Sequence, residues 1–414
     1  AYLLGYYETV SSYKYIDNYI DNIQKVTIDD IKRVTEKYLN SYNCSIGEFY
    51  SSHHETAKLV PTYDYKPKEK IHHHYQTPPI IIDEKITSIP IDFAKKILRN
   101  GLTILHTQNS TSDTVKLLGS IKAGNIYSAT VNPVLPVMCA GMLNRGSSGY
   151  TKMQIAAEIE SRGASVGITN VGESISFSLS STVKDFPFIL DILAKILLEP
   201  TFPIDEYEKY KAYAIAGIRH KKNYTEYLAE MQFSRMVFPK DHLLYGYNIN
   251  TQIEQLESLS IEDIKDYYYN YFSPHITIMS VAGNIDTCQA FSLIERYFGK
   301  WERKEIPEPV LKQVRLQRKL KEKVIKIKDK TEASVIFGHY FPISRTSKDY
   351  HKAVVMNFIL GGSGALSSRI GLRIREDMGL VYSISSGFSC FSIPGAWSAR
   401  FGVDCNYADL ALKT

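Results

Sequence analysis

Cysteine is scarce in this sequence, and the cysteines that occur are not arranged as a disulfide framework. The 414 residues include only five cysteines, an odd number, and no two of them form a Cys-x-x-Cys pair. Small secreted domains that depend on disulfides carry an even set at paired spacings. We therefore expect free thiols at all five positions, which are Cys44, Cys139, Cys288, Cys390 and Cys405.

Long apolar runs and a strong net charge are also missing. No apolar run approaches the roughly 18 residues that a membrane-spanning helix needs. The net charge of +5 is small for this length, so it gives no reason to expect nucleic acid as a partner. With 44% apolar and 22% charged residues, the composition is ordinary for a soluble globular protein of two to three domains.

One segment is locally basic. Residues 312–330 contain nine Lys or Arg against two acidic residues. Such a run could bind phosphate groups. It could also be a solvated linker that enters an edge strand, because Val324, Ile325 and Ile327 alternate with its lysines. We favour the linker, since charge runs are usually solvated faces.

An internal repeat organises the chain. Residues 26–32 match residues 259–265 without gaps, at an offset of 260 − 27 = 233. Thr27 and Ser260 are each followed three residues later by Asp, which predicts a capping box at the start of a helix. A repeat of this period indicates similar domains rather than short solenoid units. We therefore interpret residues 1–50 as the C-terminal remnant of a preceding α+β domain.

The segment that follows has no helical or strand period. Residues 51–86 are rich in Pro and His, and we interpret them as a linker. Its triple histidine, His72 to His74, has no acidic or thiol partners nearby, so we do not predict a metal site there. The chain starts without Met inside apparent domain sequence and stops where a helix is starting. We expect a fragment, cut at both ends.

Residues 87–303 have the pattern of a complete α+β domain. An Asn-Gly turn at Gly101 predicts a hairpin, and alternating apolar residues predict another hairpin over residues 164–181. Helices are expected over 136–143, from the capping-box residue Thr151, over 187–198 and over 204–222. The fold class we predict is α+β, with repeated domains that are each an antiparallel sheet covered by helices.

Residues 304–414 repeat the front of that plan, as an α+β domain truncated at its C-terminus. Val137-Met138 corresponds to Val355-Met356, an offset of 355 − 137 = 218, and Gly163 corresponds to Gly379. In this domain a Gly-rich turn is followed by a short helix that bears an arginine, and then by a strand that carries a tyrosine.

The positions of this arginine and tyrosine hold polar residues only in the second copy of the repeat. With the glycines aligned, Arg375 falls opposite Ile159 and Tyr382 opposite Val166. Two related domains thus share a scaffold, and one of them adds a polar pair. Without a functional role, Arg375 would be a surface arginine paired with a nearby carboxylate, and Tyr382 would be a strand tyrosine that packs its ring. The contrast between the two copies favours a functional role instead.

The Gly-rich turn over residues 360–369, followed by Arg375 and Tyr382, resembles the substrate-side motif of the pitrilysin (insulinase) family of zinc metallopeptidases, the inverzincins. Further resemblances lie at Lys122-Ala123-Gly124, Leu143 to Ser147 and Ile294 to Trp301. In that family an Arg and a Tyr seven positions apart reach across a closed chamber to the substrate at the zinc; here 382 − 375 = 7. The resemblance implies substrate binding by Arg375 and Tyr382.

Two glycines of the turn complete the candidate substrate-binding set. Gly361 and Gly362 could let backbone approach a peptide, or could simply form a helix-capping loop. The turn falls short of a Gly-x-Ser-x-Gly nucleophile elbow and lacks the Gly-Lys-Ser/Thr of a phosphate loop.

The zinc motif of the family, His-x-x-Glu-His on a helix, is absent. The resemblance places its five positions at residues 137–141, so the two His ligands and the general base become Val137, Gly141 and Ala140. The third ligand should fall near Ala216 or Gly217. Zinc needs three protein ligands, so we predict no metal, no cofactor and no catalytic residue in this fragment.

The resemblance therefore implies the non-zinc, substrate-binding half of a metalloendopeptidase, inactive alone. A zinc-bearing N-terminal half, upstream in the same chain or in a partner subunit, would complete a half-clamshell chamber for peptides or unfolded polypeptides. The alternative is a non-catalytic scaffold or core subunit of the same fold. Arg375 and Tyr382 favour the peptidase. Substrate, compartment and oligomeric state are not determined by the sequence.

Overall fold

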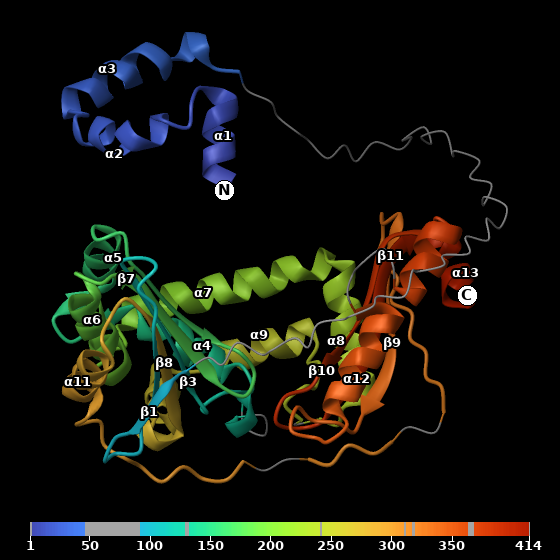
Figure 1. Cartoon of the computed structure of the whole chain (residues 1–414). Helices are drawn as coiled ribbons and strands as arrows, with labels where there is room; N and C mark the ends of the chain where they lie inside the picture. Colours follow the sequence, from blue (N-terminus) through green and yellow to red (C-terminus); the bar gives the residue numbers. More distant parts are fainter. Residues whose placement is uncertain are drawn as a thin grey trace, which may run out of the picture. The chain divides into compact units, whose positions relative to one another are not determined.

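The computed structural model describes residues 2–45, 92–128, 132–240, 242–309, 312–316, 319–362 and 368–413. They belong to two compact units, residues 2–45 and residues 92–413 (Figure 1). The predicted linker at 51–86, its triple histidine and residues 363–367 of the Gly-rich turn lie outside the described residues. Among the described helices, none combines the length and apolar character that crossing a bilayer requires.

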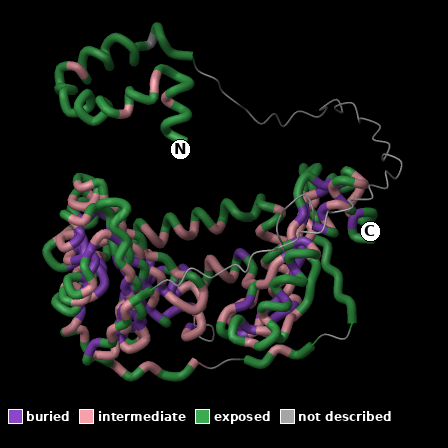
Figure 2. The backbone as a smooth tube through the Cα atoms, in the orientation of Figure 1, coloured by how far each residue is buried: buried purple, intermediate pink, exposed green. Residues whose placement is uncertain are grey.

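The first unit is helical. Thr27 caps α3, where its hydroxyl accepts from the Asp30 amide at 3.2 Å and the Asp30 carboxylate accepts from the Thr27 amide. This confirms the predicted capping box. The apolar residues Ile28 and Ile31 of α3 are exposed. Most of the described backbone of this unit has the colour of exposed residues in Figure 2. The elements are α1 (Tyr2–Val10), α2 (Tyr15–Gln24), α3 (Ile28–Tyr38) and the 3₁₀ turn η1 (Ser41–Asn43).

The second unit contains a six-stranded sheet in the order β1-β2-β8-β3-β7-β6. Every neighbouring pair is antiparallel except β2 and β8, which are parallel. A hairpin pattern reveals local antiparallel pairs only, so the sequence did not indicate the parallel pair. The strands are β1 (Ala94–Ile97), β2 (Thr103–Gln108), β3 (Thr114–Ile121), β6 (Ser165–Asn170), β7 (Ile175–Thr182) and β8 (Thr277–Gly283).

Helices cover one face of this sheet. The inward residues of β7, Ile175, Phe177 and Leu179, are almost fully buried, as their alternation predicts. They join the main apolar core with residues of α4, α6, α10 and α11. The bounds are η2 (Asn125–Tyr127), α4 (Leu135–Leu143), β4 (Gly146–Ser147), β5 (Tyr150–Thr151), α5 (Lys152–Glu160), α6 (Phe186–Leu198), α7 (Ile204–His220), η3 (Lys221–Asn223), α8 (Thr225–Val237), α9 (Ile249–Glu257), α10 (Ile261–Tyr271), η4 (Pro274–Ile276) and α11 (Thr287–Phe298).

A second, three-stranded sheet follows, in the order β10-β11-β9. Helix α8 packs on its strand β9, where Val237 and Phe238 meet Ala396 in a separate apolar cluster. A helix that precedes β8 in the chain thus covers the later sheet. The elements are β9 (Glu332–Phe341), α12 (Tyr350–Asn357), η5 (Phe358–Gly362), η6 (Gly371–Asp377), β10 (Val381–Ser389), β11 (Gly395–Asp404), η7 (Cys405–Tyr407) and α13 (Ala408–Lys413).

The two sheets repeat one plan. The order β3-β7-β6 in the first corresponds to β9-β11-β10 in the second. Gly163 and Gly379 have nearly equal positive φ angles, 60° and 62°, and each lies two residues before its strand. Left-handed backbone of this kind favours glycine. The predicted α+β fold class is confirmed.

Helices α3 and α10 are a second repeated feature. Ser260 caps α10 as Thr27 caps α3, with Asp263 as its partner, and both helices have 11 residues.

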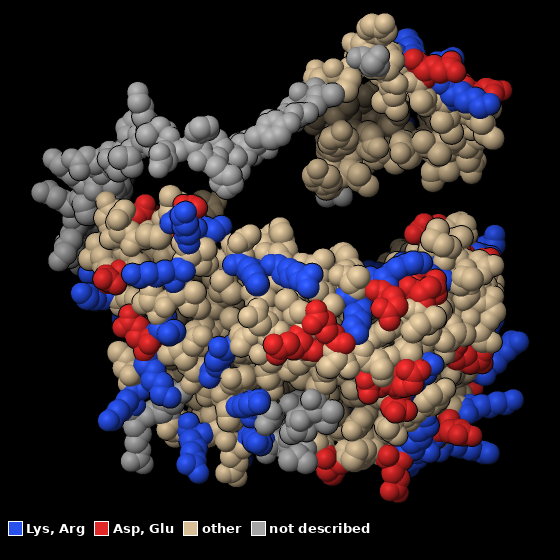
Figure 3. Space-filling view, turned by 180° about the vertical axis from the view of Figure 1, so that it is seen from behind, with Lys and Arg blue, Asp and Glu red and all other residues tan. Residues whose placement is uncertain are grey.

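On the face shown in Figure 3, acidic and basic side chains are interspersed, which fits the small net charge.

A buried histidine should make the second unit sensitive to acid. His106 on β2 is 2% exposed, its Nδ1 lies 3.0 Å from Thr287 Oγ1, and its Nε2 has no partner. Burial lowers the pKa of His106, although a backbone hydrogen bond at Ile285 and the charge of Asp286 oppose this. The folded state therefore takes up a proton on His106 at a lower pH than the unfolded chain, whose histidine protonates near its ordinary pKa of about 6.5, so stability is lost as the pH falls.

We expect the melting temperature to fall between pH 7.5 and pH 5.0, and the fall to shrink in His106→Phe. His351→Phe is the control, because His351 is exposed on α12. Thermal melts at both pH values check this, and equal pH dependence in wild type and His106→Phe would contradict it. His242 and His275, whose pKa values are also lowered by burial, contribute to the dependence that remains, as does Glu206, whose pKa is lowered by its cationic partners.

Candidate functional site

The positions aligned with the inverted zinc motif lie on α4, and α7 packs against that helix. Gly141 faces the ring of Tyr210 on α7, and a Cβ atom at Gly141 would overlap the Tyr210 hydroxyl. A histidine could therefore not occupy position 141 while Tyr210 holds its place. Val137 is exposed and Ala140 is buried, and neither side chain has a nitrogen, oxygen or sulfur atom that could bind a metal.

An arginine locks this arrangement. Arg145 Nε donates to the Gly141 carbonyl oxygen at 2.9 Å, and its Nη1 donates to Glu206 Oε2 at 3.1 Å. Its guanidinium carbon lies 4.2 Å from the centroid of the Tyr210 ring, within reach of a cation–π interaction. The space where a metal would lie thus holds a packed aromatic ring covered by a paired cation.

The carboxylate that Arg145 contacts, Glu206, is also engaged by lysine side chains. Lys152 Nζ lies 3.3 Å from Glu206 Oε2, in addition to the Arg145 contact. Burial would raise the pKa of Glu206, but the hydrogen bonds from Lys152 and Arg145 outweigh it, so that the pKa is lowered. Lys209 Nζ also lies 3.4 Å from Glu206 Oε1. Glu206 is therefore an ionised partner of three cations rather than a general base.

The predicted third-ligand positions do not complete a site either. Ala216 and Gly217 are exposed on α7, and a Cβ atom at Gly217 would touch nothing. No group of three His, Cys, Asp or Glu side chains suited to a metal ion occurs within the described residues. The residues on α4 and α7 do not fit zinc.

We expect no stoichiometric zinc in the purified chain after His72 to His74 are replaced. We expect the same of the variant Val137→His/Ala140→Glu/Gly141→His, because Tyr210 occupies the space beside Gly141 and Ala216 and Gly217, where the third ligand is expected, carry no ligand atom. Elemental analysis after dialysis checks both. One tightly held zinc per chain in the variant without His72 to His74 would contradict the prediction.

Arg375 and Tyr382 lie together at the start of the second domain's strand β10. Arg375 is on η6, Gly379 turns the chain, and Tyr382 is the second residue of β10. The Arg375 guanidinium carbon lies 5.6 Å from the Tyr382 ring centroid, and Arg375 Nε lies 3.5 Å from Glu376 Oε1. The seven-residue spacing thus brings the two side chains into contact.

Tyr382 is presented to solvent. Its side chain is 89% exposed, and the register of β10 with β11 shifts between Val381 and Ile384. An irregularity of this kind re-aims side chains at the end of a strand. The phenol is therefore free to meet another molecule, and Arg375, about one-third exposed, lies beside it.

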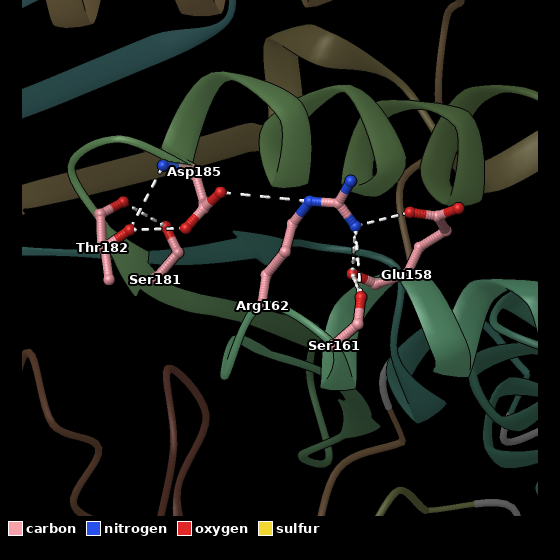
Figure 4. Close-up of polar contacts among 6 residues, drawn as sticks. All are labelled: Glu158, Ser161, Arg162, Ser181, Thr182 and Asp185. Atoms are coloured by element: carbon pink, nitrogen blue, oxygen red, sulfur yellow. Dashed lines mark hydrogen bonds and ion pairs between the residues drawn. The ribbon is translucent and has the colours of Figure 1, made fainter. Parts of the chain in front are cut away.

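The first domain uses the corresponding region differently. Ile159 and Val166 pack against the apolar core. The nearby arginine, Arg162, is held by Glu158 and lies 4.0 Å from Asp185 (Figure 4). Its guanidinium also lies over the Phe188 ring at 3.9 Å. This cation joins the end of α5 to the start of α6, whereas Arg375 contacts the exposed ring of Tyr382.

Gly361 and Gly362 end a π-helical turn, η5, that continues α12. A Cβ atom at Gly361 would overlap the Ile370 side chain, and one at Gly362 would overlap the amide of Asn357. Both glycines are thus needed for close packing within the domain, and Gly361 is buried while Gly362 is exposed. π-Turns of this kind occur often at functional sites.

Sequence reasoning missed Asn357, the last residue of α12. Its Nδ2 donates to the Ser386 carbonyl oxygen at 3.1 Å, and its Oδ1 accepts from Ser386 Oγ and from Trp397 Nε1, both at 2.8 Å. The side chain ties the start of the Gly-rich turn to two strands. The sequence signal that could have identified Asn357 is its position as a single polar residue within the apolar run 353–360.

Comparison with protein families gives two matches. Residues 103–244 match the sequence profile described as insulinase (peptidase family M16), and residues 258–412 match the one described as the peptidase M16 inactive domain. Together these matches cover most of the described second unit.

Curated relatives carry different names. The chain is 25% identical over 312 residues to "Uncharacterized zinc protease YmxG" of Bacillus subtilis, covering 74% of this chain and 73% of that protein. It is 26% identical to "Non-peptidase homolog YmxG" of Helicobacter pylori, covering 62% and 58%. It is 23% identical to mitochondrial-processing peptidase subunit beta of Saccharomyces cerevisiae, covering 76% and 70%.

Solved structures share the fold. A peptidase M16 inactive domain from Pseudomonas fluorescens superposes with a TM-score of 0.70 at 18% identity, covering 78% of this chain and 77% of that one. A protease from Helicobacter pylori superposes with a TM-score of 0.68 at 15% identity, covering 76% of each chain.

Proposed function

Because the chain belongs to the insulinase (M16) family, whose members include proteins named as zinc proteases and as non-peptidase homologues, we propose that it forms the non-zinc, substrate-binding half of a peptide-hydrolysing chamber. The observation that carries this proposal is the contact between Arg375 and the exposed ring of Tyr382. In the sister domain the corresponding positions are apolar and packed.

The chemistry of the pair suits a peptide backbone. The Tyr382 hydroxyl can donate a hydrogen bond to a substrate carbonyl oxygen, and the bond strengthens as negative charge develops on that oxygen. The Arg375 guanidinium carries fixed donors that can orient the same peptide group. Glu376 lies close enough to Arg375 to help fix the direction of the guanidinium.

The apolar and small residues at the zinc positions support a function in which this chain binds the substrate and another half supplies the zinc. Tyr210 and Arg145 close the space beside α4, so water activation would have to come from another half, upstream in the same chain or in a partner subunit. One relative is itself named as a subunit of a processing peptidase, which supports assembly with a partner. The chain by itself should be inactive.

The second candidate function is a non-catalytic scaffold or core subunit. It is favoured by the name of the Helicobacter relative, a non-peptidase homologue, and by the absence of a fitting zinc site beside α4. A scaffold has no need of Arg375 and Tyr382 as a pair. Loss of both side chains would then leave assembly and function unchanged.

A reconstitution experiment separates the two functions. The chain is combined with a zinc-bearing M16 half from the same organism, and cleavage of a quenched fluorescent peptide is followed. The proposal expects cleavage only when both halves are present. Association without cleavage, for every zinc-bearing half encoded in that genome, would favour the scaffold.

A further inference from the structure

Two hairpin turns of the second unit meet. Residues 171–174 connect β6 to β7 in the first domain, and residues 390–394 connect β10 to β11 in the second. Because β7 and β6 correspond to β11 and β10 in the repeated plan, these turns are equivalent parts of the two copies. We call their meeting point the turn contact; it consists of Gly172, Glu173, Phe391 and Ser392.

Glu173 makes the polar part of the turn contact. The Ser392 backbone N–H donates to Glu173 Oε2 at 2.9 Å, and Ser392 Oγ donates to Glu173 Oε1 at 2.6 Å. One residue thus engages both oxygens of the carboxylate. Hydrogen bonds to an ionised acceptor are stronger than those between neutral groups and fix the geometry more closely. The carboxylate therefore holds the second domain's turn at a defined place.

The apolar part of the turn contact is a ring packed on bare backbone. A Cβ atom at Gly172 would lie 3.0 Å from Phe391 Cζ, and the φ angle of Gly172, 82°, also favours glycine. The other contact between the two domains is that of α8 with the second sheet. A second, separate point of attachment restricts rotation of one domain against the other.

The first domain holds its own turn firmly. The backbone N–H groups of Gly124 and Asn125 donate to the carbonyl oxygens of Glu173 and Gly172, at 3.0 and 2.6 Å. Gly124 and Asn125 lie in the connection between β3 and α4. The turn is therefore tied to the body of the first domain on the side opposite to its contact with Ser392.

The second domain holds its turn in an equivalent way. The Arg345 backbone N–H donates to the Phe391 carbonyl oxygen at 2.9 Å, and Arg345 Nε donates to the Cys390 carbonyl oxygen at 3.2 Å. Arg345 lies in the connection between β9 and α12, the counterparts of β3 and α4. Since each turn is tied to its own domain, a shift between the turns is a shift between the domains.

Strand β10 links the turn contact to the Arg375–Tyr382 pair. Tyr382 lies seven residues before Ser389, the last residue of β10, which corresponds to roughly 23 Å at about 3.3 Å per residue. A rotation of about 3° around the turn would displace the start of an arm of that length by about 1 Å. A misplacement of about 1 Å can lower the rate of a reaction about 100-fold.

We propose that Glu173 is a positioning residue for the reaction. By holding Ser392 it fixes the angle between the two domains, and β10 carries that angle to Tyr382 and Arg375. The effect on the reaction rests on the proposed function, whereas the effect on the domain angle does not. Glu173 touches neither side chain of the pair, so it acts only through the turn and the strand.

A distance measurement tests the domain angle without reference to catalysis. Spin labels are attached at Met153→Cys on α5 and Lys352→Cys on α12, both exposed positions, after the three exposed cysteines are replaced by Ser. In Glu173→Ala we expect a broader distribution of label distances, because the second domain is then held mainly by α8. Glu160→Ala, at an exposed residue outside the turn contact, is the matched control and should keep the wild-type distribution.

The kinetic test uses the assembled peptidase. Glu173→Ala should lower kcat at least about 10-fold, with a smaller effect on KM, because Tyr382 is displaced from the developing oxyanion. Glu173→Gln keeps one acceptor oxygen and should recover part of kcat and part of the narrow distance distribution. The melting temperature should stay near that of wild type, because Ser392 is exposed. A purely structural role would instead lower the melting temperature and leave kcat unchanged.

The outcomes separate this proposal from the proposed function. An unchanged distance distribution in Glu173→Ala overturns the control of the domain angle. A broadened distribution with unchanged kcat overturns the positioning role. If the wild-type chain shows no cleavage with any zinc-bearing half, the proposed function fails and the positioning role fails with it. The distance measurement still decides in that case whether Glu173 fixes the angle between the domains.

Discussion

Replacing Tyr382 with Phe should lower kcat by about 10- to 1,000-fold in the assembled peptidase, with a smaller effect on KM. This is the loss expected when one hydrogen-bond donor directed at a developing oxyanion is removed. Arg375→Ala should reduce kcat and raise KM, because an arginine can orient the bound peptide as well as stabilise charge. Steady-state kinetics with a fluorogenic peptide measure both variants.

Folding must be separated from catalysis in this experiment. Tyr382 is 89% exposed, so its hydroxyl should contribute less than about 0.5 kcal/mol to stability. Tyr213→Phe is the matched control, since Tyr213 is 75% exposed on α7 and should leave kcat unchanged. If kcat/KM of Tyr382→Phe equals that of wild type, or if the melting temperature of this variant drops sharply, we would conclude that Arg375 and Tyr382 have only a structural role.

Replacing Asn357 with Leu should destabilise the second domain by about 2 to 5 kcal/mol. The change leaves the buried Ser386 Oγ and the partly buried Trp397 Nε1 without the acceptor they share. A buried donor left unpaired costs roughly 1–3 kcal/mol, and the Ser386 carbonyl oxygen also loses its donor. Because the Asn357 amide lies beside Gly362, hydrogen exchange at Gly361 and Gly362 should accelerate as well.

The two tryptophans of the chain make this measurable. In a Trp301→Phe background the remaining fluorescence comes from Trp397, which lies in the affected network, so a urea titration reports on the second domain. Asn406→Leu is the control at an exposed asparagine, expected to change stability by less than about 0.5 kcal/mol. An unchanged urea midpoint for Asn357→Leu would mean that the network contributes little.

Short-range interactions were readable from the sequence. The capping boxes at Thr27 and Ser260 involve residues three apart, and Gly163 and Gly379 are required by local left-handed backbone. The seven-residue spacing of Arg375 and Tyr382 was also visible in the sequence, whereas their mutual contact was found only in the structure. The α+β fold class followed from periodicity and from the internal repeat.

Contacts between distant segments could be found only in the tertiary structure. Nothing in the sequence indicated that Tyr210 fills the space over Gly141, that β2 pairs parallel with β8, or that α8 covers β9. Each depends on which apolar surfaces meet once the chain has collapsed, and several partners satisfy the same pattern until shape and burial select one. The sequence by itself determined which groups are missing from the zinc positions and which polar pair is present. Only the packing decided what occupies the space beside Gly141 and which apolar faces stay uncovered.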